Sequence, residues 1–198
     1  MPSPAPFIPP ALVKARTGDW IGQAWEVVKT DIGLFVGMTL LYAIVGGCVP
    51  IVLQGSMQAG LHIACMKKLV RGRMEIGDLF LGFNFFVPAL LAAIVISVFA
   101  SIGFLLCIIP GMVLYAMYSF TYLFIVDKRM DFWPAMQASH AVVKNDYVGF
   151  TLFVLALGLL NFVGVLCCLV GVLVTIPISF MAITIAYREI VGLEPTTV

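Results

Sequence analysis

The chain has 198 residues, of which 62% are hydrophobic and only 11% are charged, and its formal net charge is +1. Soluble domains are nearer half apolar and a quarter charged, so this composition excludes an ordinary soluble protein and indicates a membrane protein. The low net charge and the lack of a basic stripe exclude a nucleic-acid-binding domain.

The chain begins with the segment MPSPAPFIPP, which holds five prolines and no basic residue. Proline prevents a helix here, and a secretory signal would begin with positive charge. We therefore expect residues 1–17 to form a disordered, Pro-rich cytoplasmic tail. Residues 18–192 are expected to form one membrane domain, and residues 193–198 a short cytoplasmic tail.

Three long stretches contain no acidic residue, Lys or Arg: Ile32 to Met66, Leu79 to Val126, and Tyr147 to Tyr187. As one helix, the last stretch would be roughly 60 Å long, twice the ~30 Å hydrocarbon core of a bilayer, so it has to cross and return. Each stretch predicts a pair of spans. The predicted fold is all-α and polytopic, with six transmembrane helices in three hairpins and the lipid bilayer as partner.

An amphipathic segment precedes each predicted hairpin. The first runs from Asp19 to Asp31 and the second from Glu75 to Phe83, while the third begins at the N-cap residue Asp131 and ends at Asn145. Such segments lie in the membrane interface, with aromatic side chains at headgroup depth. In the second segment, the predicted apolar face consists of Ile76, Leu79, Phe80 and Phe83. The predicted interfacial anchors are Trp20, Trp25, Phe80 and Trp133.

Several spacings recur between the three units. Residues 27–31 read VVKTD and residues 142–146 read VVKND, and the distance from Pro50 to Lys67 equals that from Pro110 to Asp127. Turns are expected at residues 46–50, at 109–111 and beside Gly171. An even number of spans per unit predicts parallel repeats, arranged with threefold pseudosymmetry about an axis along the membrane normal.

The charged residues all fall before the first span, in the two long connectors, or after the sixth span. Short loops that carry positive charge stay in the cytoplasm. Both termini and both long connectors are therefore predicted to be cytoplasmic, and the three tight turns are predicted to face outward.

A polar stripe runs along the second predicted span, where Gln54, Gln58 and His62 follow one another at intervals of four residues. A ladder of small residues that includes Gly60 lies on nearly the opposite face, so this helix is expected to be surrounded by protein. Asn161 is the buried amide of the fifth span. These side chains either form hydrogen bonds between helices or line a pathway for a solute, and the sequence leaves both readings open.

No other motif indicates chemistry. His62 and Cys65 have no further ligands at membrane depth, so neither a metal nor a cofactor is expected. Catalytic motifs are lacking, so the chain is not expected to be an enzyme. The remaining cysteines lie near the outward turns, where they either pack as apolar residues or pair as disulfides: Cys48, Cys107, Cys167 and Cys168.

Several segments together carry a resemblance: DLFLGF, IPG, FIVDK, FWPAMQASHAVVKND and IPISFMAITIAYREIVG. They resemble a group of uncharacterised bacterial integral membrane proteins, which looks related to the membrane domain attached to some glycerophosphoryl diester phosphodiesterases. The resemblance covers roughly Trp20 to Gly192. It implies a bacterial inner-membrane location and transfers no active site, because its motifs lie at interfaces and turns.

Two functions follow as hypotheses. The leading one is a non-enzymatic membrane scaffold or partner subunit, which would bind a membrane protein, a cytoplasmic protein or a second copy of itself through its cytoplasmic collar of interfacial helices. The alternative is a small-solute or lipid permease, with a pathway lined by Gln54, Gln58, His62 and Asn161.

Overall fold

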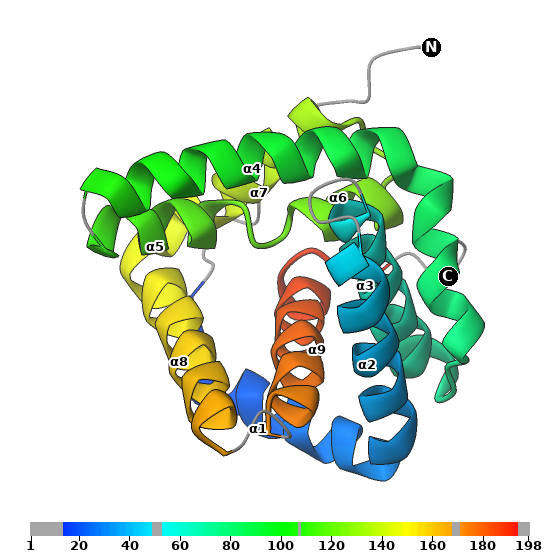
Figure 1. Ribbon diagram of the computed structural model, residues 1–198. Coiled ribbons are helices and arrows are strands. Elements are labelled where there is room, and N and C mark those ends of the chain that lie inside the picture. Colours follow the sequence, from blue (N-terminus) through cyan, green and yellow to red (C-terminus); the bar gives the residue numbers. More distant parts are fainter. Residues whose placement is uncertain (1–13, 49–52, 107, 168–170, 194–198) are drawn as a thin grey trace.

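The structure is a computed structural model, and it describes residues 14–48, 53–106, 108–167 and 171–193. The described part of the chain is helical and contains no strand, which confirms the all-α prediction (Figure 1). Its elements are, in order, α1 (Thr17–Thr30), α2 (Ile32–Cys48), α3 (Gln54–Arg71), the 3-10 helix η1 (Ile76–Phe85), α4 (Phe86–Leu106), α5 (Ile108–Met117), α6 (Thr121–Asp127), α7 (Phe132–Val143), the 3-10 turn η2 (Lys144–Asp146), α8 (Tyr147–Leu166) and α9 (Val172–Ile190).

Length and composition identify three helical segments that are apolar and long enough to cross a membrane: Ile76–Gly103, Phe132–Leu166 and Gly171–Ile190. A fourth is added if α1 and α2, which are bent by 99° from each other, count as one broken span. These segments fit a membrane protein. Neither α3 nor the pair α5 and α6 is among them.

Burial divides the helices into an inner and an outer set. Every residue of α6 is buried, as are most residues of α3 and α9. In contrast, α2, α4 and α8 expose large apolar side chains, such as Ile44, Val98 and Phe162. An exposed apolar belt of this kind has to be covered by lipid or by protein.

The backbones of α3 and η1 touch through two glycines. A Cβ atom added to Gly60 would lie 1.9 Å from the Leu79 carbonyl oxygen, and one added to Gly82 would lie 2.0 Å from the Ser56 carbonyl oxygen. Only glycine permits this approach. The small-residue ladder of the second predicted span is therefore the face of α3 that packs against η1.

The apolar residues predicted to share one face of residues 75–83 are divided between the interior and the outer surface. Leu79 is buried, but Ile76 and Phe80 are exposed and Phe83 is only half-buried. The segment is a 3-10 helix, so its period of three residues turns Asp78, Leu79 and Gly82 toward the interior instead.

The predicted fourth span is broken in the structure. Residues 109–111, expected to form a turn, belong to the start of α5, but α4 and α5 pack against each other with Gly103 facing Gly111, so the chain reverses beside the predicted turn. A second break, which the sequence did not predict, lies between Met117 and Thr121. The Ser139 hydroxyl of α7 holds this break together, because it accepts a hydrogen bond from the Phe120 backbone N–H at 3.2 Å and donates one to the Met117 carbonyl at 2.7 Å. The break places Tyr118 and Ser119 in the wall of the cavity described below.

The structure describes only some of the cysteines that were predicted to lie near the outward turns. Cys107 and Cys168 lie outside the described residues, as do residues 49–52 of the first turn and 168–170 of the third. Cys167 is an exposed free thiol at the end of α8. Disulfide pairing at this end stays a prediction.

Candidate functional site

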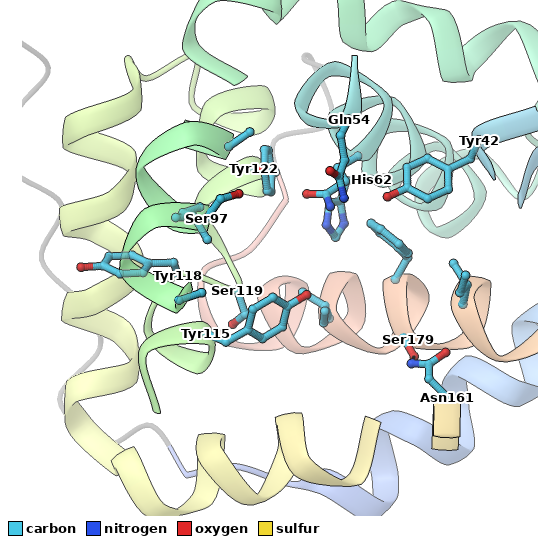
Figure 2. A pocket seen from close by; sticks show the side chains of 17 residues that line it. Tyr42, Gln54, His62, Ser97, Tyr115, Tyr118, Ser119, Tyr122, Asn161 and Ser179 are labelled. Carbon is cyan, nitrogen blue, oxygen red and sulfur yellow. Dashed lines mark hydrogen bonds between the residues drawn. The ribbon is translucent and has the colours of Figure 1, made fainter. Parts of the chain in front are cut away.

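A cavity of about 360 Å³ lies among the helices (Figure 2). Its walls come from α2, α3, α4, α5, α6, α8, α9 and the break between α5 and α6, whereas α1, η1 and α7 contribute none of the described lining residues. All lining residues within the described ranges lack a formal charge at neutral pH. The polar ones are Tyr42, Gln54, Gln58, His62, Ser97, Tyr115, Tyr118, Ser119, Tyr122, Asn161 and Ser179.

The structure brings the four predicted polar residues together in this one cavity. Gln54, Gln58 and His62 reach it from α3, and Asn161 reaches it from α8. Gln54 is exposed while His62 is only 2% exposed, so the stripe runs from an open side of the cavity into the interior.

His62 forms a hydrogen bond between two inner helices. Its Nδ1 lies 3.1 Å from the Thr184 hydroxyl of α9, and the Phe180 ring packs beside the imidazole with ring centroids 4.9 Å apart. The Thr184 hydroxyl also donates a hydrogen bond to the Phe180 carbonyl at 2.8 Å. His62 thus contributes to helix packing as well as to the cavity wall.

Asn161 joins α8 to α9 in a similar way. Its Nδ2 donates to the Leu157 carbonyl at 2.9 Å and to the Ser179 hydroxyl at 2.8 Å. Its Oδ1 is buried and has no hydrogen-bond partner among the described residues. A buried amide oxygen without a partner costs free energy unless something else satisfies it.

The two glutamines behave differently from His62 and Asn161. In the described part of the chain, neither Gln54 nor Gln58 forms a side-chain hydrogen bond. Of the four predicted residues, His62 and Asn161 therefore form hydrogen bonds between helices. Gln54 and Gln58 line the cavity without a hydrogen-bond partner among the described residues.

Four tyrosines complete the walls and were missed by the sequence analysis. Tyr42 comes from α2, Tyr115 from α5, Tyr118 from the break and Tyr122 from α6. Tyrosine in an apolar span also suits a membrane interface, so its residue type gives no indication of a cavity. Tyr115 is 47% exposed, which places it at the open side.

The cavity offers binding groups rather than a catalytic constellation. No carboxylate lines it among the described residues, and in these ranges no cluster of three His, Cys, Asp or Glu side chains is suited to a metal ion. Amide, hydroxyl and imidazole groups are the ones that orient a polar ligand within an apolar wall.

Charged residues of α3, η1, α6 and α9, and of α1 with its flanking residues, contact one another, and this set of contacts is called here the charged end. Lys67 on α3 lies 2.5 Å from Asp78 on η1, with only 20% and 8% of the two side chains exposed. The buried Asp127 carboxylate accepts a hydrogen bond from the Tyr187 hydroxyl at 3.0 Å. These contacts tie the ends of the inner helices to each other and to η1.

Two more contacts of the charged end involve α1 and its junction with α2. Glu189 accepts a hydrogen bond from the Trp20 indole at 2.5 Å and pairs with Arg16 at 2.8 Å. Lys68 donates a hydrogen bond to Asp31, which holds the pKa of that carboxyl below its usual range.

The predicted anchors fall into two groups. Trp20 is 1% exposed and packs against Phe150 and Phe153, so it stabilises the docking of α1 on α8 instead of facing outward. The other three are exposed, as interfacial anchors need to be, and their depth in a membrane stays a prediction: Trp25, Phe80 and Trp133.

Comparison with curated proteins finds mycobacterial relatives. The chain is 28% identical over 159 residues to "Uncharacterized protein Rv2560" of Mycobacterium tuberculosis and 29% identical to "Uncharacterized protein Mb2590" of Mycobacterium bovis. Each match covers 80% of this chain and 46% of the relative, so the chain spans about half the length of the curated relatives it matches. No protein-family profile matches the chain, and no solved structure does.

Proposed function

We propose that this chain is a non-enzymatic membrane protein that binds a small molecule in its central cavity and carries it, as a small-solute or lipid permease. One observation carries the proposal: polar side chains from seven helices and the break between two of them converge on one uncharged cavity, where Gln58 is half-buried without a hydrogen-bond partner among the described residues. Polar groups are costly inside a membrane protein, so those that do not bond to protein are best explained by a ligand.

We further propose six spans, with hairpins formed by α2 and α3, by α4 with α5 and α6, and by α8 and α9. The burial pattern supports this, because α3, α6 and α9, which end the three hairpins, are inner helices. An inner helix touches protein on most sides and needs less hydrophobicity than a helix in lipid. This explains how α3 crosses despite its polar stripe.

The threefold pseudo-repeat is part of the same proposal. Lys67, Asp127 and Tyr187 end equivalent spans in the three units, and the Tyr187 hydroxyl bonds to Asp127 while α3 packs against both α6 and α9. Contacts between equivalent helix ends support an axis that runs among the inner helices.

The proposed location is the bacterial inner membrane, with both termini in the cytoplasm. The concentration of Lys and Arg at one end of the helices supports this orientation. The resemblance to bacterial integral membrane proteins and the mycobacterial relatives support the location.

Flux into liposomes tests the permease. Ser97 is exposed and lines the cavity, so Ser97→Phe fills the open side; Val98→Phe, at the next exposed position of α4 outside the cavity, is the matched control. Over a panel of metabolites and short-chain lipids, we expect at least one flux that Ser97→Phe abolishes and Val98→Phe leaves intact. Absence of flux, or flux that Ser97→Phe does not change, would contradict the proposal.

A scaffold or partner subunit is the second candidate. A shallow cavity of about 590 Å³ at the charged end lies between α1, α3 and α9, and its lining includes Arg16, Asp19, Glu26 and Arg188. Such a mixed-charge surface suits a charged segment of another protein. The scaffold hypothesis would be favoured over the permease if native co-purification recovers a partner and an Arg188→Glu variant loses that partner while it retains its fold.

A further inference from the structure

The hydrogen bonds at the cavity wall fix which atoms of His62 remain available. A hydroxyl group has one hydrogen, and that of Thr184 is donated to the Phe180 carbonyl. Thr184 therefore accepts a hydrogen bond from the Nδ1–H of His62. In this tautomer Nε2 is a hydrogen-bond acceptor, and it has no partner among the described residues.

The same logic fixes the orientation of the Asn161 amide. Ser179 donates its hydrogen to the Thr175 carbonyl at 2.9 Å, so it accepts the bond from Asn161 Nδ2. This leaves Oδ1 as a buried acceptor without a partner among the described residues. In both cases, an α9 hydroxyl donates its hydrogen to a carbonyl of its own helix and accepts a hydrogen bond from the cavity residue. The acceptor atom of that residue, His62 Nε2 or Asn161 Oδ1, has no partner among the described residues.

We infer that the cavity binds an uncharged, hydroxyl-bearing ligand, one hydroxyl group of which donates a hydrogen bond to His62 Nε2. The inference rests on the proposed function and names the ligand class of that site. The tyrosine hydroxyls and glutamine amides of the wall both donate and accept, as hydroxyl groups do.

The charge of the wall argues against other ligand classes. No Asp, Glu, Lys or Arg lines the described cavity, so an ammonium or phosphate group would lose its hydration without gaining an opposite charge. An uncharged ligand avoids this penalty. The aromatic rings of Tyr42, Tyr115 and Phe180 supply apolar surface for its carbon skeleton.

Such a ligand has two sources, a free polyol or the glycerol headgroup of a neutral lipid. Tritiated probes separate them when their binding to the protein in nanodiscs is measured by scintillation proximity. The free probes are glycerol and mannitol, and the lipid probe is 1,2-dioctanoylglycerol. The charged counterparts are glycerol 3-phosphate and dioctanoyl phosphatidic acid.

We expect a neutral probe of one source to bind the wild-type protein, to be blocked by Ser97→Phe and to be unaffected by Val98→Phe. Its charged counterpart should bind at least about tenfold more weakly. His62→Leu should weaken the neutral probe by about tenfold, which corresponds to the loss of one hydrogen bond. The wild-type comparison stands even if the His62 variant does not fold.

Two results would overturn the inference in distinguishable ways. Binding of a charged probe in preference to its neutral counterpart, blocked by Ser97→Phe, would refute the ligand class and leave the binding cavity in place. If no probe binds in a way that Ser97→Phe blocks, the ligand class is refuted. If flux into liposomes is also absent, the permease is refuted as well.

Discussion

Lys67, Asp78 and Asp127 at the charged end have protein partners, whereas several polar side chains in the cavity have none among the described residues. At the charged end Lys67 pairs with Asp78, and Asp127 bonds to Tyr187. In the cavity, Gln58 forms no side-chain hydrogen bond within the described ranges. Satisfied polar groups stabilise a fold, and unsatisfied ones weaken it. The comparison therefore separates residues that hold the helices together from residues kept for a ligand.

The largest effect is expected from breaking the partly buried ion pair of the charged end. Asp78→Ala leaves Lys67 without its partner and removes the bond that the Asp78 side chain accepts from the Glu75 backbone N–H. The free energy of unfolding should fall by about 3 kcal/mol, measured by denaturant unfolding in mixed micelles. As the control, Asp19→Ala removes a pair with Arg16 that is more than half exposed and should cost about 0.5 kcal/mol or less. Equal losses in the two variants would show that the buried pair has no special weight.

A smaller effect is expected from separating α3 and η1. Gly60→Ala places a Cβ atom against the Leu79 backbone, so the two helices have to move apart and α3 shifts toward the cavity. We expect a loss of about 1 to 3 kcal/mol in unfolding free energy. Gly37→Ala on α2 is the control, because its Cβ meets nothing within 4 Å and alanine favours a helix. A neutral Gly60→Ala would mean that the contact with η1 does not position the polar stripe.

The smallest effect is expected from pH at the partly exposed pair of Asp31 and Lys68. The pKa of Asp31 is lowered in the folded protein because Lys68 donates a hydrogen bond to it. The stabilisation is complete above the pKa of an unfolded Asp, ~3.9, and is lost as the pH falls through the lowered folded pKa. Thermal unfolding in nanodiscs between about pH 5 and about pH 2 should show a fall in stability that is smaller in Asp31→Asn than in the wild type. Identical pH profiles for the two proteins would mean that the pair of Asp31 and Lys68 does not stabilise the fold.

Much of the fold follows from hydrophobic runs and small residues. The helical class, the bounds of α2 and the burial of α3 are predictable because charge-free stretches and a Gly60 ladder leave few alternatives. The break at Tyr118 to Phe120 is not, since no Gly or Pro marks it. It depends on Ser139, which is distant in sequence and bonds to both sides of the break.

The candidate site is predictable only on the helices where polar residues are conspicuous. Gln54, Gln58 and His62 stand out at a spacing of four, and Asn161 stands out within an apolar run. Tyr115 and Tyr122 do not, because a tyrosine in a span is equally suited to the interface, and their direction depends on the break between α5 and α6. Trp20 shows the converse: its residue type fits the interface, but Glu189 and Phe150 hold it in the interior.

The most direct test of the central claim compares Gln58→Leu with His62→Leu in lipid nanodiscs. His62 bonds to Thr184, so His62→Leu should lower the unfolding free energy by about 0.6 to 2 kcal/mol. Gln58 has no such bond among the described residues, so Gln58→Leu should leave thermal stability unchanged or raise it, while ligand-dependent flux falls. A clear loss of stability in Gln58→Leu, with flux retained, would mean that the stripe serves helix packing and would contradict the account.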